Sequence, residues 1–211
     1  MPVEPLILVQ YLAAVLALVL SPGPDTALIL RYTVTSGPRV GLATVAGVQI
    51  GLAVHTLLAV LGISLLIASS PLLFRTVAVV GALYLGWLGW QGLRGAGLLT
   101  FGKRRAAVGA GKACRDAVLT NLLNPKVILL FLALLPNFVD AERTDVPLQL
   151  AFLGAMLILV NTIWQLLLAW TAERVRRWFE HPLVGRLVSA GTGAALLLMA
   201  ALMLWSHVIA A

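Results

Sequence analysis

Six long apolar segments separated by polar connections constrain the fold of this 211-residue sequence more than any other feature. About 20 helical residues cross a membrane core roughly 30 Å thick, and each segment reaches that length. The segments are Leu6–Leu30, Gly41–Ile67, Leu72–Leu93, Ala117–Pro136, Leu148–Thr171 and Leu187–Val208. We therefore expect an all-α, polytopic membrane protein with six transmembrane helices, forming a single integral membrane domain over residues 1–211.

The composition excludes a soluble globular protein. Hydrophobic residues make up 61% of the chain and charged residues 11%, against about 45–50% and 25% in soluble domains. The net charge of +7 does not indicate a nucleic-acid partner, because the basic residues lie between apolar segments rather than in a separate domain. The lipid bilayer is the expected partner. The start of the chain lacks a positive n-region, so we expect no cleaved signal, and the single Cys114 excludes an intramolecular disulfide.

The charges of the connections predict the orientation. Three alternate connections carry twelve basic residues: Arg31, Arg39, Arg94, Lys103, Arg104, Arg105, Lys112, Arg115, Arg174, Arg176, Arg177 and Arg186. The opposite side carries two, Arg75 and Arg143, together with Glu4, Asp140, Glu142 and Asp145. Because basic loops stay on the cytoplasmic side, this asymmetry predicts that both termini lie outside.

The first apolar segment contains the run Ser21-Pro22-Gly23-Pro24-Asp25, which predicts a break in a membrane-spanning helix. Proline removes a backbone donor and clashes with the preceding turn, and glycine tolerates unusual backbone angles. Broken backbone at membrane depth persists only where protein or water satisfies the freed groups. A carboxylate beside such a break is costly in lipid and is therefore a candidate functional residue.

A second break in the fourth segment suggests an internal duplication. The run Asn124-Pro125-Lys126 again couples a proline to an ionisable residue, about a hundred positions after the first break. Paired interruptions in corresponding positions of two halves point to a transport site between inverted repeats. We expect a 3+3 inverted repeat with broken first and fourth helices, the halves being residues 1–105 and 106–211.

These motifs resemble the lysine exporter (LysE/RhtB) family of amino-acid efflux proteins. The resemblance rests on Ser21-Pro22-Gly23-Pro24, the glycine-spaced second segment, Asn124-Pro125-Lys126 and the length of the chain. It implies a bacterial inner-membrane exporter of amino acids or close derivatives, energised by the membrane gradient. Our leading hypothesis is a secondary exporter that exchanges its substrate for protons.

Asp25 and Lys126 are the central candidates for substrate binding or coupling. Asp25 could bind a substrate ammonium or carry a proton; alternatively, it caps the helix that begins after the break. Lys126 lies about 13 Å into the fourth segment if a helix begins near Ala117. Its ammonium could bind a substrate carboxylate or pair with Asp25, or its stem could extend to the cytoplasmic interface.

The other candidate site residues are Pro22, Gly23, Pro24, Asn124, Pro125, Gln49, His55, Asn161 and Gln165. The prolines and Gly23 would free backbone groups for a zwitterion, or merely kink the helix. Asn124, with Asn121, would satisfy backbone groups around the second break. Each of the other four polar residues would line a cavity or form hydrogen bonds between helices.

Two glycines, Gly47 and Gly51, predict close helix approach within the bundle or at the seam of a homodimer.

Rival functions have weaker signatures in the sequence than the exporter. A metal or small-ion exporter would need several ligands, and the segments offer Asp25 and His55. A membrane-embedded enzyme would need a motif such as HExxH or GxSxG, and neither occurs. We therefore predict no catalytic residues, no metal site and no cofactor.

Overall fold

The computed structural model describes residues 2–21, 23–69, 107–172, 174 and 182–205, with scattered positions between 72 and 94. Every regular element in these ranges is helical, which confirms the all-α prediction. The α-helices are α1 (Pro5–Leu20), α2 (Pro24–Ser36), α3 (Pro38–Ser69), α5 (Ala110–Leu122), α6 (Pro125–Leu129), α7 (Val146–Trp170) and α9 (Pro182–Leu204). A π-helical turn, η1 (Leu130–Leu134), and a 3-10 turn, η2 (Leu135–Phe138), follow α6.

The described helices include two that are long and apolar enough to cross a membrane, within α3 and α7. Two further spans result if each bent pair of helices counts as one. The described part of the chain thus holds two to four candidate spans. Most of the predicted span Leu72–Leu93 lies outside the described residues, and the count of six remains a prediction.

Both predicted helix breaks are confirmed. α1 ends at Leu20 and α2 begins at Pro24, with a bend of 53° between them. α5 ends at Leu122 and α6 begins at Pro125, and the chain bends by 57° there. In each case a proline occupies the first turn of the new helix. A backbone amide at that position has no acceptor within the helix, so the proline costs no helical hydrogen bond.

The start of the fourth span differs from the prediction. α5 begins at Ala110 rather than near Ala117, so the basic connection ends seven residues earlier than its composition indicated. A 2.7 Å ion pair between Lys112 and Asp116, four residues apart, supports the additional turns. Lys126 therefore follows about 24 Å of helical rise rather than about 13 Å, and it lies near the middle of the bent pair.

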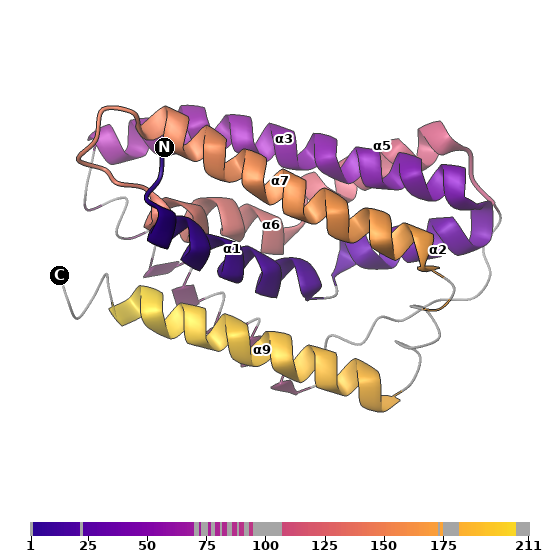
Figure 1. The fold of residues 1–211 in the computed structure, drawn as a ribbon. Coiled ribbons are helices and arrows are strands. Elements are labelled where there is room, and N and C mark those ends of the chain that lie inside the picture. Colours follow the sequence, from indigo (N-terminus) through magenta and orange to yellow (C-terminus); the bar gives the residue numbers. More distant parts are fainter. Residues whose placement is uncertain are drawn as a thin grey trace.

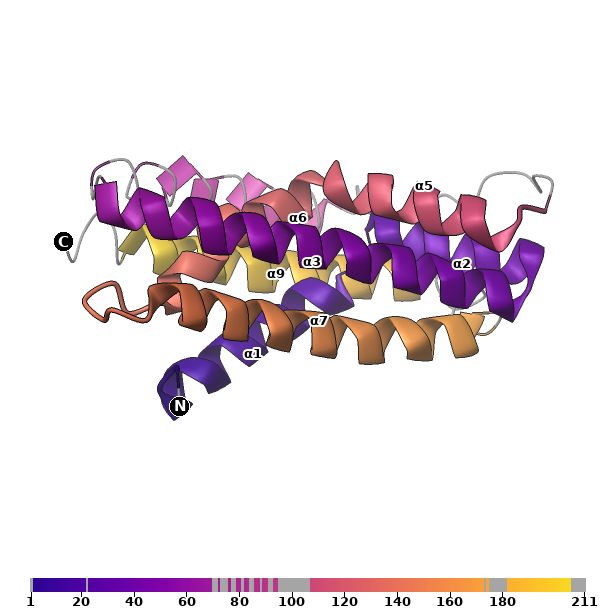
Figure 2. The same ribbon diagram turned by 90° about the horizontal axis from the view of Figure 1, so that it is seen from above.

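Helix α3 packs against α2, α5 and α7. Its two spaced glycines both face α5. A Cβ on Gly47 would lie 2.8 Å from the Ala117 Cβ, and one on Gly51 would lie 2.5 Å from Asn121 Oδ1. These glycines therefore serve close approach within the bundle. On the other side, α1 crosses α7 at an angle and also contacts α9 (Figures 1 and 2).

The connections with opposite charge lie at opposite ends of the bundle (Figure 1). The N-terminus lies at the same end as the acidic turn between η2 and α7. The turn between α2 and α3, the start of α5 and the end of α7 lie at the other end, with the basic residues Arg39 and Lys112. This arrangement is the one that the charge asymmetry requires, and the direction of the bundle in the membrane remains a prediction.

Candidate functional site

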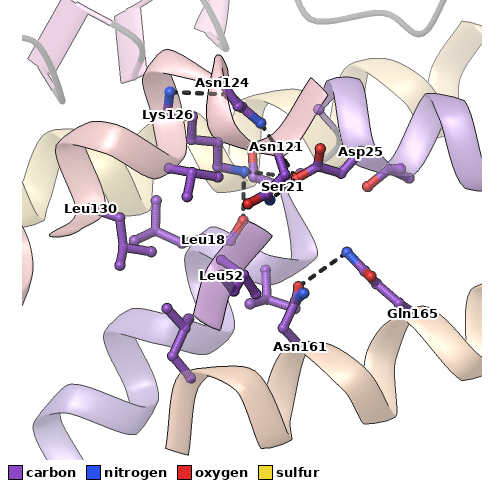
Figure 3. Close-up of a pocket in the computed structure, with 15 residues that line it drawn as sticks. Leu18, Ser21, Asp25, Leu52, Asn121, Asn124, Lys126, Leu130, Asn161 and Gln165 are labelled. Carbon is purple, nitrogen blue, oxygen red and sulfur yellow. Dashed lines mark hydrogen bonds between the residues drawn. The ribbon is translucent and has the colours of Figure 1, made fainter. Parts of the chain in front are cut away.

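A cavity of about 60 Å³ lies where the two helix breaks meet, between α1, α2, α3, α5, α6 and α7 (Figure 3). One water molecule needs about 10–15 Å³ of such space, so the cavity has room for a handful of waters. Its polar lining consists of Ser21, Asp25, Thr26, Asn121, Asn124, Lys126, Asn161 and Gln165. Its apolar lining consists of Leu18, Val19, Leu52, Val127, Leu130 and Leu157, and Gly23 also borders it.

Asp25 reaches across the cavity from the first turn of α2 to the second broken span. Its Oδ2 accepts hydrogen bonds from Asn121 Nδ2 at 2.9 Å and from Asn124 Nδ2 at 3.5 Å. Gly23 is the N-cap of α2, and no side chain of the described residues caps that helix end. Asp25 Oδ1 is buried and has no hydrogen-bond partner among the described residues. The carboxylate thus binds the neighbouring span rather than its own helix, with one oxygen left for another donor.

The two asparagines have different tasks. Asn124 is the N-cap of α6, and its Oδ1 accepts a 3.1 Å hydrogen bond from the Lys126 amide. Asn121 is fully buried, and its carboxamide lies against Gly51 of α3 while it donates to Asp25. The prediction that both asparagines satisfy backbone groups holds for Asn124; the side chain of Asn121 holds the carboxylate.

Lys126 points back to the end of α1. Its Nζ donates to the Leu18 carbonyl at 2.6 Å and to the Ser21 carbonyl at 2.9 Å. Among the ion pairs of the described residues, none joins Lys126 to Asp25, although both line the cavity. Of the alternatives for Lys126, this geometry fits neither a direct pair with Asp25 nor a stem extended toward the cytoplasmic end.

Three amide side chains form a ring beside the cavity. Gln49 Nε2 donates to Gln165 Oε1 at 2.9 Å, Gln165 Nε2 donates to Asn161 Oδ1 at 3.4 Å, and Asn161 Nδ2 donates to Gln49 Oε1 at 3.5 Å. Asn161 and Gln165 line the cavity from α7, and Gln49 joins them to α3. Two members of the ring therefore line the cavity, and the ring as a whole connects α3 and α7, so both alternatives for these residues apply.

His55 contacts a residue of the site from outside the cavity. Its Nε2 is 3.4 Å from the Asn121 carbonyl, and its ring stacks on Phe131 with centroids 5.4 Å apart. Neither His55 nor Gln49 belongs to the cavity lining. Pro24 and Pro125 begin α2 and α6, and Pro22 lies outside the described residues.

One known protein family matches the part of the chain that contains both helix breaks and the cavity. The LysE type translocator family matches residues 16–207, which include both helix breaks and every residue that lines the cavity. The chain belongs to the LysE type translocator family. It is therefore a membrane protein of a transporter family, as the two proline motifs indicated.

Relatives of this LysE-type translocator align over most of their length. It is 31% identical to a homoserine/homoserine lactone efflux protein of Salmonella typhimurium, covering 92% of this chain and 93% of the relative. It is also 31% identical to a leucine efflux protein of Enterobacter sp., covering 81% of each. The membrane protein YrhP of Bacillus subtilis is 28% identical over 90% of this chain and 94% of the relative. No solved structure matches the chain significantly.

Sequence reasoning missed part of the translocator's cavity lining. Thr26, Leu52 and Leu157 are buried and face the cavity, yet the sequence marks them as ordinary residues of apolar segments. Thr26 had one available signal, its position directly after Asp25 at the break. The leucines had none, because many leucines of similar context pack elsewhere in the bundle.

Replacing Gln49 with Leu is expected to raise the KM of transport about tenfold and to change the maximal rate less. The substitution removes the hydrogen bond that Gln49 donates to Gln165 Oε1, so the cavity-lining amides of Asn161 and Gln165 can reorient. A buried acceptor that loses its donor costs about 1–3 kcal/mol. Thr44→Val is the matched control, because Thr44 lies on the same helix and bonds the Val40 carbonyl within it. An unchanged KM in Gln49→Leu would show that the ring does not shape the site.

Proposed function

We propose that this translocator is a secondary active exporter that moves amino acids or close derivatives from the cytoplasm to the outside by proton antiport. The observation that carries the proposal is Asp25 Oδ1, which has no hydrogen-bond partner among the described residues and lies in a cavity at two broken helices. An ammonium group or a proton is the partner that such an oxygen lacks. Because the site lies between helix breaks, a conformational change there could expose Asp25 to either side of the membrane in turn.

We further propose that residues 1–105 and 106–211 are inverted repeats of three helices, six in all. The similar bends of 53° and 57°, each followed by a helix that starts with proline, support this duplication. The two broken spans meet through bonds between residues about a hundred positions apart. One half would then rock against the other around the cavity, which is the usual motion of inverted-repeat carriers.

The cavity lining supports a small cargo with an uncharged side chain. Its apolar wall includes Leu18, Leu52 and Leu157, while Asp25 and the amides form the polar wall. An aliphatic side chain would fit the first wall and an ammonium group the second. The names of the relatives, which specify leucine and homoserine or its lactone, agree with such a cargo.

The proposed roles follow from these positions. Asp25 receives the substrate ammonium and the counter-transported proton, Asn121 and Asn124 hold its carboxylate, and the breaks at Gly23-Pro24 and Pro125 supply free backbone groups. Gln49, Asn161 and Gln165 shape the opposite wall, and His55 supports Asn121. We place the protein in a bacterial inner membrane with both termini outside; a homodimer is compatible with this arrangement.

The test is efflux from proteoliposomes that contain the full chain and a panel of labelled amino acids, amino-acid lactones and dipeptides. We expect one class to leave faster than from protein-free vesicles, faster again when the outside is acidified, and more slowly with a protonophore. If no compound moves, amino-acid export is wrong. If a compound moves but ignores the proton gradient, export stands and antiport is wrong.

A further inference from the structure

The carbonyl groups at the end of α1 accept hydrogen bonds from an ammonium group. The last four carbonyls of a helix have no partner within it, and they give the C-terminal end a partial negative charge. α1 has no basic residue in its last turn, and Ser21 after it is extended, with φ −65° and ψ 118°. The Leu18 and Ser21 carbonyls are instead bonded by an ammonium from the other half of the chain, that of Lys126.

The local structure of the second break directs this ammonium. Asn124 caps α6 through the Lys126 amide, so Lys126 is fixed as the second residue of the new helix. From there its side chain extends to Leu18 and Ser21, more than a hundred positions earlier in the sequence. Figure 3 shows the side chain crossing toward both carbonyls. The contact joins the two broken spans directly.

In carriers with broken helices, unwound carbonyls and helix C-terminal ends are the groups that coordinate a coupling sodium ion. A lysine ammonium offers the same single charge on a compact group with three donors. Two of those donors are already used by Leu18 and Ser21. The cation at this site is therefore a side chain of the protein itself rather than a bound ion.

We propose that the Lys126 ammonium is the resident cation of this carbonyl site, in the place where a sodium-coupled carrier would bind Na⁺, so that the translocator works without sodium. The inference about transport rests on the proposed exporter function. The inference about the cation site rests on the contacts of Lys126 alone. This arrangement also gives the two charged residues of the cavity separate tasks. Lys126 donates to the carbonyls at the end of α1, and Asp25 keeps for the cargo the oxygen Oδ1, which has no partner among the described residues.

Truncating Lys126 tests the cation site without any cargo. Lys126→Ala leaves two carbonyls facing the volume of the lost side chain, which a small exogenous cation can enter. We expect the purified full-length protein to unfold at a temperature lower by roughly 5 °C in choline chloride. Methylammonium chloride at the same ionic strength should restore at least half of this loss, whereas the wild type should unfold at one temperature in choline, sodium and methylammonium salts.

Two further variants make the comparison specific. Lys126→Met keeps most of the side-chain volume without the charge, so it should be destabilised and insensitive to methylammonium. Lys112→Met removes an exposed lysine of α5 and its surface ion pair with Asp116, so it should lower the unfolding temperature only slightly and by the same amount in every salt. Recovery of Lys126→Ala in methylammonium chloride, with or without recovery in sodium chloride, but not in choline chloride supports the resident cation. Equal stability of Lys126→Ala and wild type in choline, or no recovery in methylammonium, overturns it.

Efflux completes the test. Wild-type efflux should be equal in sodium and choline buffers, and Lys126→Ala should lower it at least about tenfold, since each hydrogen bond to a charged group contributes roughly that factor. Wild-type efflux that requires sodium would overturn the proposal. If the wild type moves no compound at all, the exporter function fails, and the unfolding measurements still decide the cation site.

Discussion

Asp25→Asn is expected to insert at normal abundance and to lose export by about two orders of magnitude. The asparagine oxygen can still accept the hydrogen bonds of Asn121 and Asn124, so the contact between the broken spans survives. Its amide nitrogen then takes the place of the free Oδ1, where a donor replaces an acceptor. Such a group neither binds an ammonium nor carries a proton, and hydrogen bonds to charged groups contribute about 1.5–3 kcal/mol each.

The measurement is the initial rate of efflux from cells loaded with the transported compound, at matched membrane abundance. Glu142→Gln is the control, because it also removes one carboxylate, but from an exposed position in the turn before α7. We expect that control to export normally. Full export by Asp25→Asn would refute the role of the carboxylate in both binding and coupling.

Gly51→Ala is expected to destabilise the protein by about 1–3 kcal/mol and to reduce export about tenfold. The added Cβ would lie 2.5 Å from Asn121 Oδ1, 2.8 Å from its Cβ and 2.9 Å from its Cγ. Asn121 is fully buried, so it can make room only by moving, and movement weakens its 2.9 Å hydrogen bond to Asp25. One methyl group on α3 thus affects the carboxylate on α2 through a residue of α5.

Gly62 on the same helix provides the opposite control. Beyond its chain neighbours and the backbone of its own helix, no atom of the described residues lies within 4 Å of a Cβ built there, so Gly62→Ala should stabilise α3 by about 0.5–1 kcal/mol and leave export unchanged. The double variant Gly51→Ala with Asn121→Ala separates packing from function. It should regain part of the stability lost in Gly51→Ala, because the contacts with Asn121 Oδ1 and Cγ are gone while the one with its Cβ remains, and it should still export poorly, because Asp25 lacks its donor. Normal export by Gly51→Ala would show that Asn121 does not position Asp25.

The sequence by itself determined the helical membrane class and the positions of both helix breaks. Long apolar runs need helices because lipid offers no partners for the backbone, and a proline interrupts a helix wherever it stands beyond the first turn. Both effects act within a few residues, so they can be predicted without knowing what packs nearby. The same holds for Asp25 as a candidate, since a carboxylate in such a segment is costly wherever the helix lies.

The tertiary structure alone decided the partners of these residues. That Lys126 bonds the end of α1 rather than Asp25, that Asn121 reaches Asp25, and that Gln49 joins the amides of α7 all depend on how the helices cross. The early start of α5 at Ala110 likewise shifted Lys126 toward the middle of its bent span. Contacts between residues 96 or 105 positions apart are set by the close approach of whole helices, and the approach of α3 to α5 requires Gly47 and Gly51 to lack a side chain. That requirement is a property of the packed bundle rather than of any local stretch of sequence.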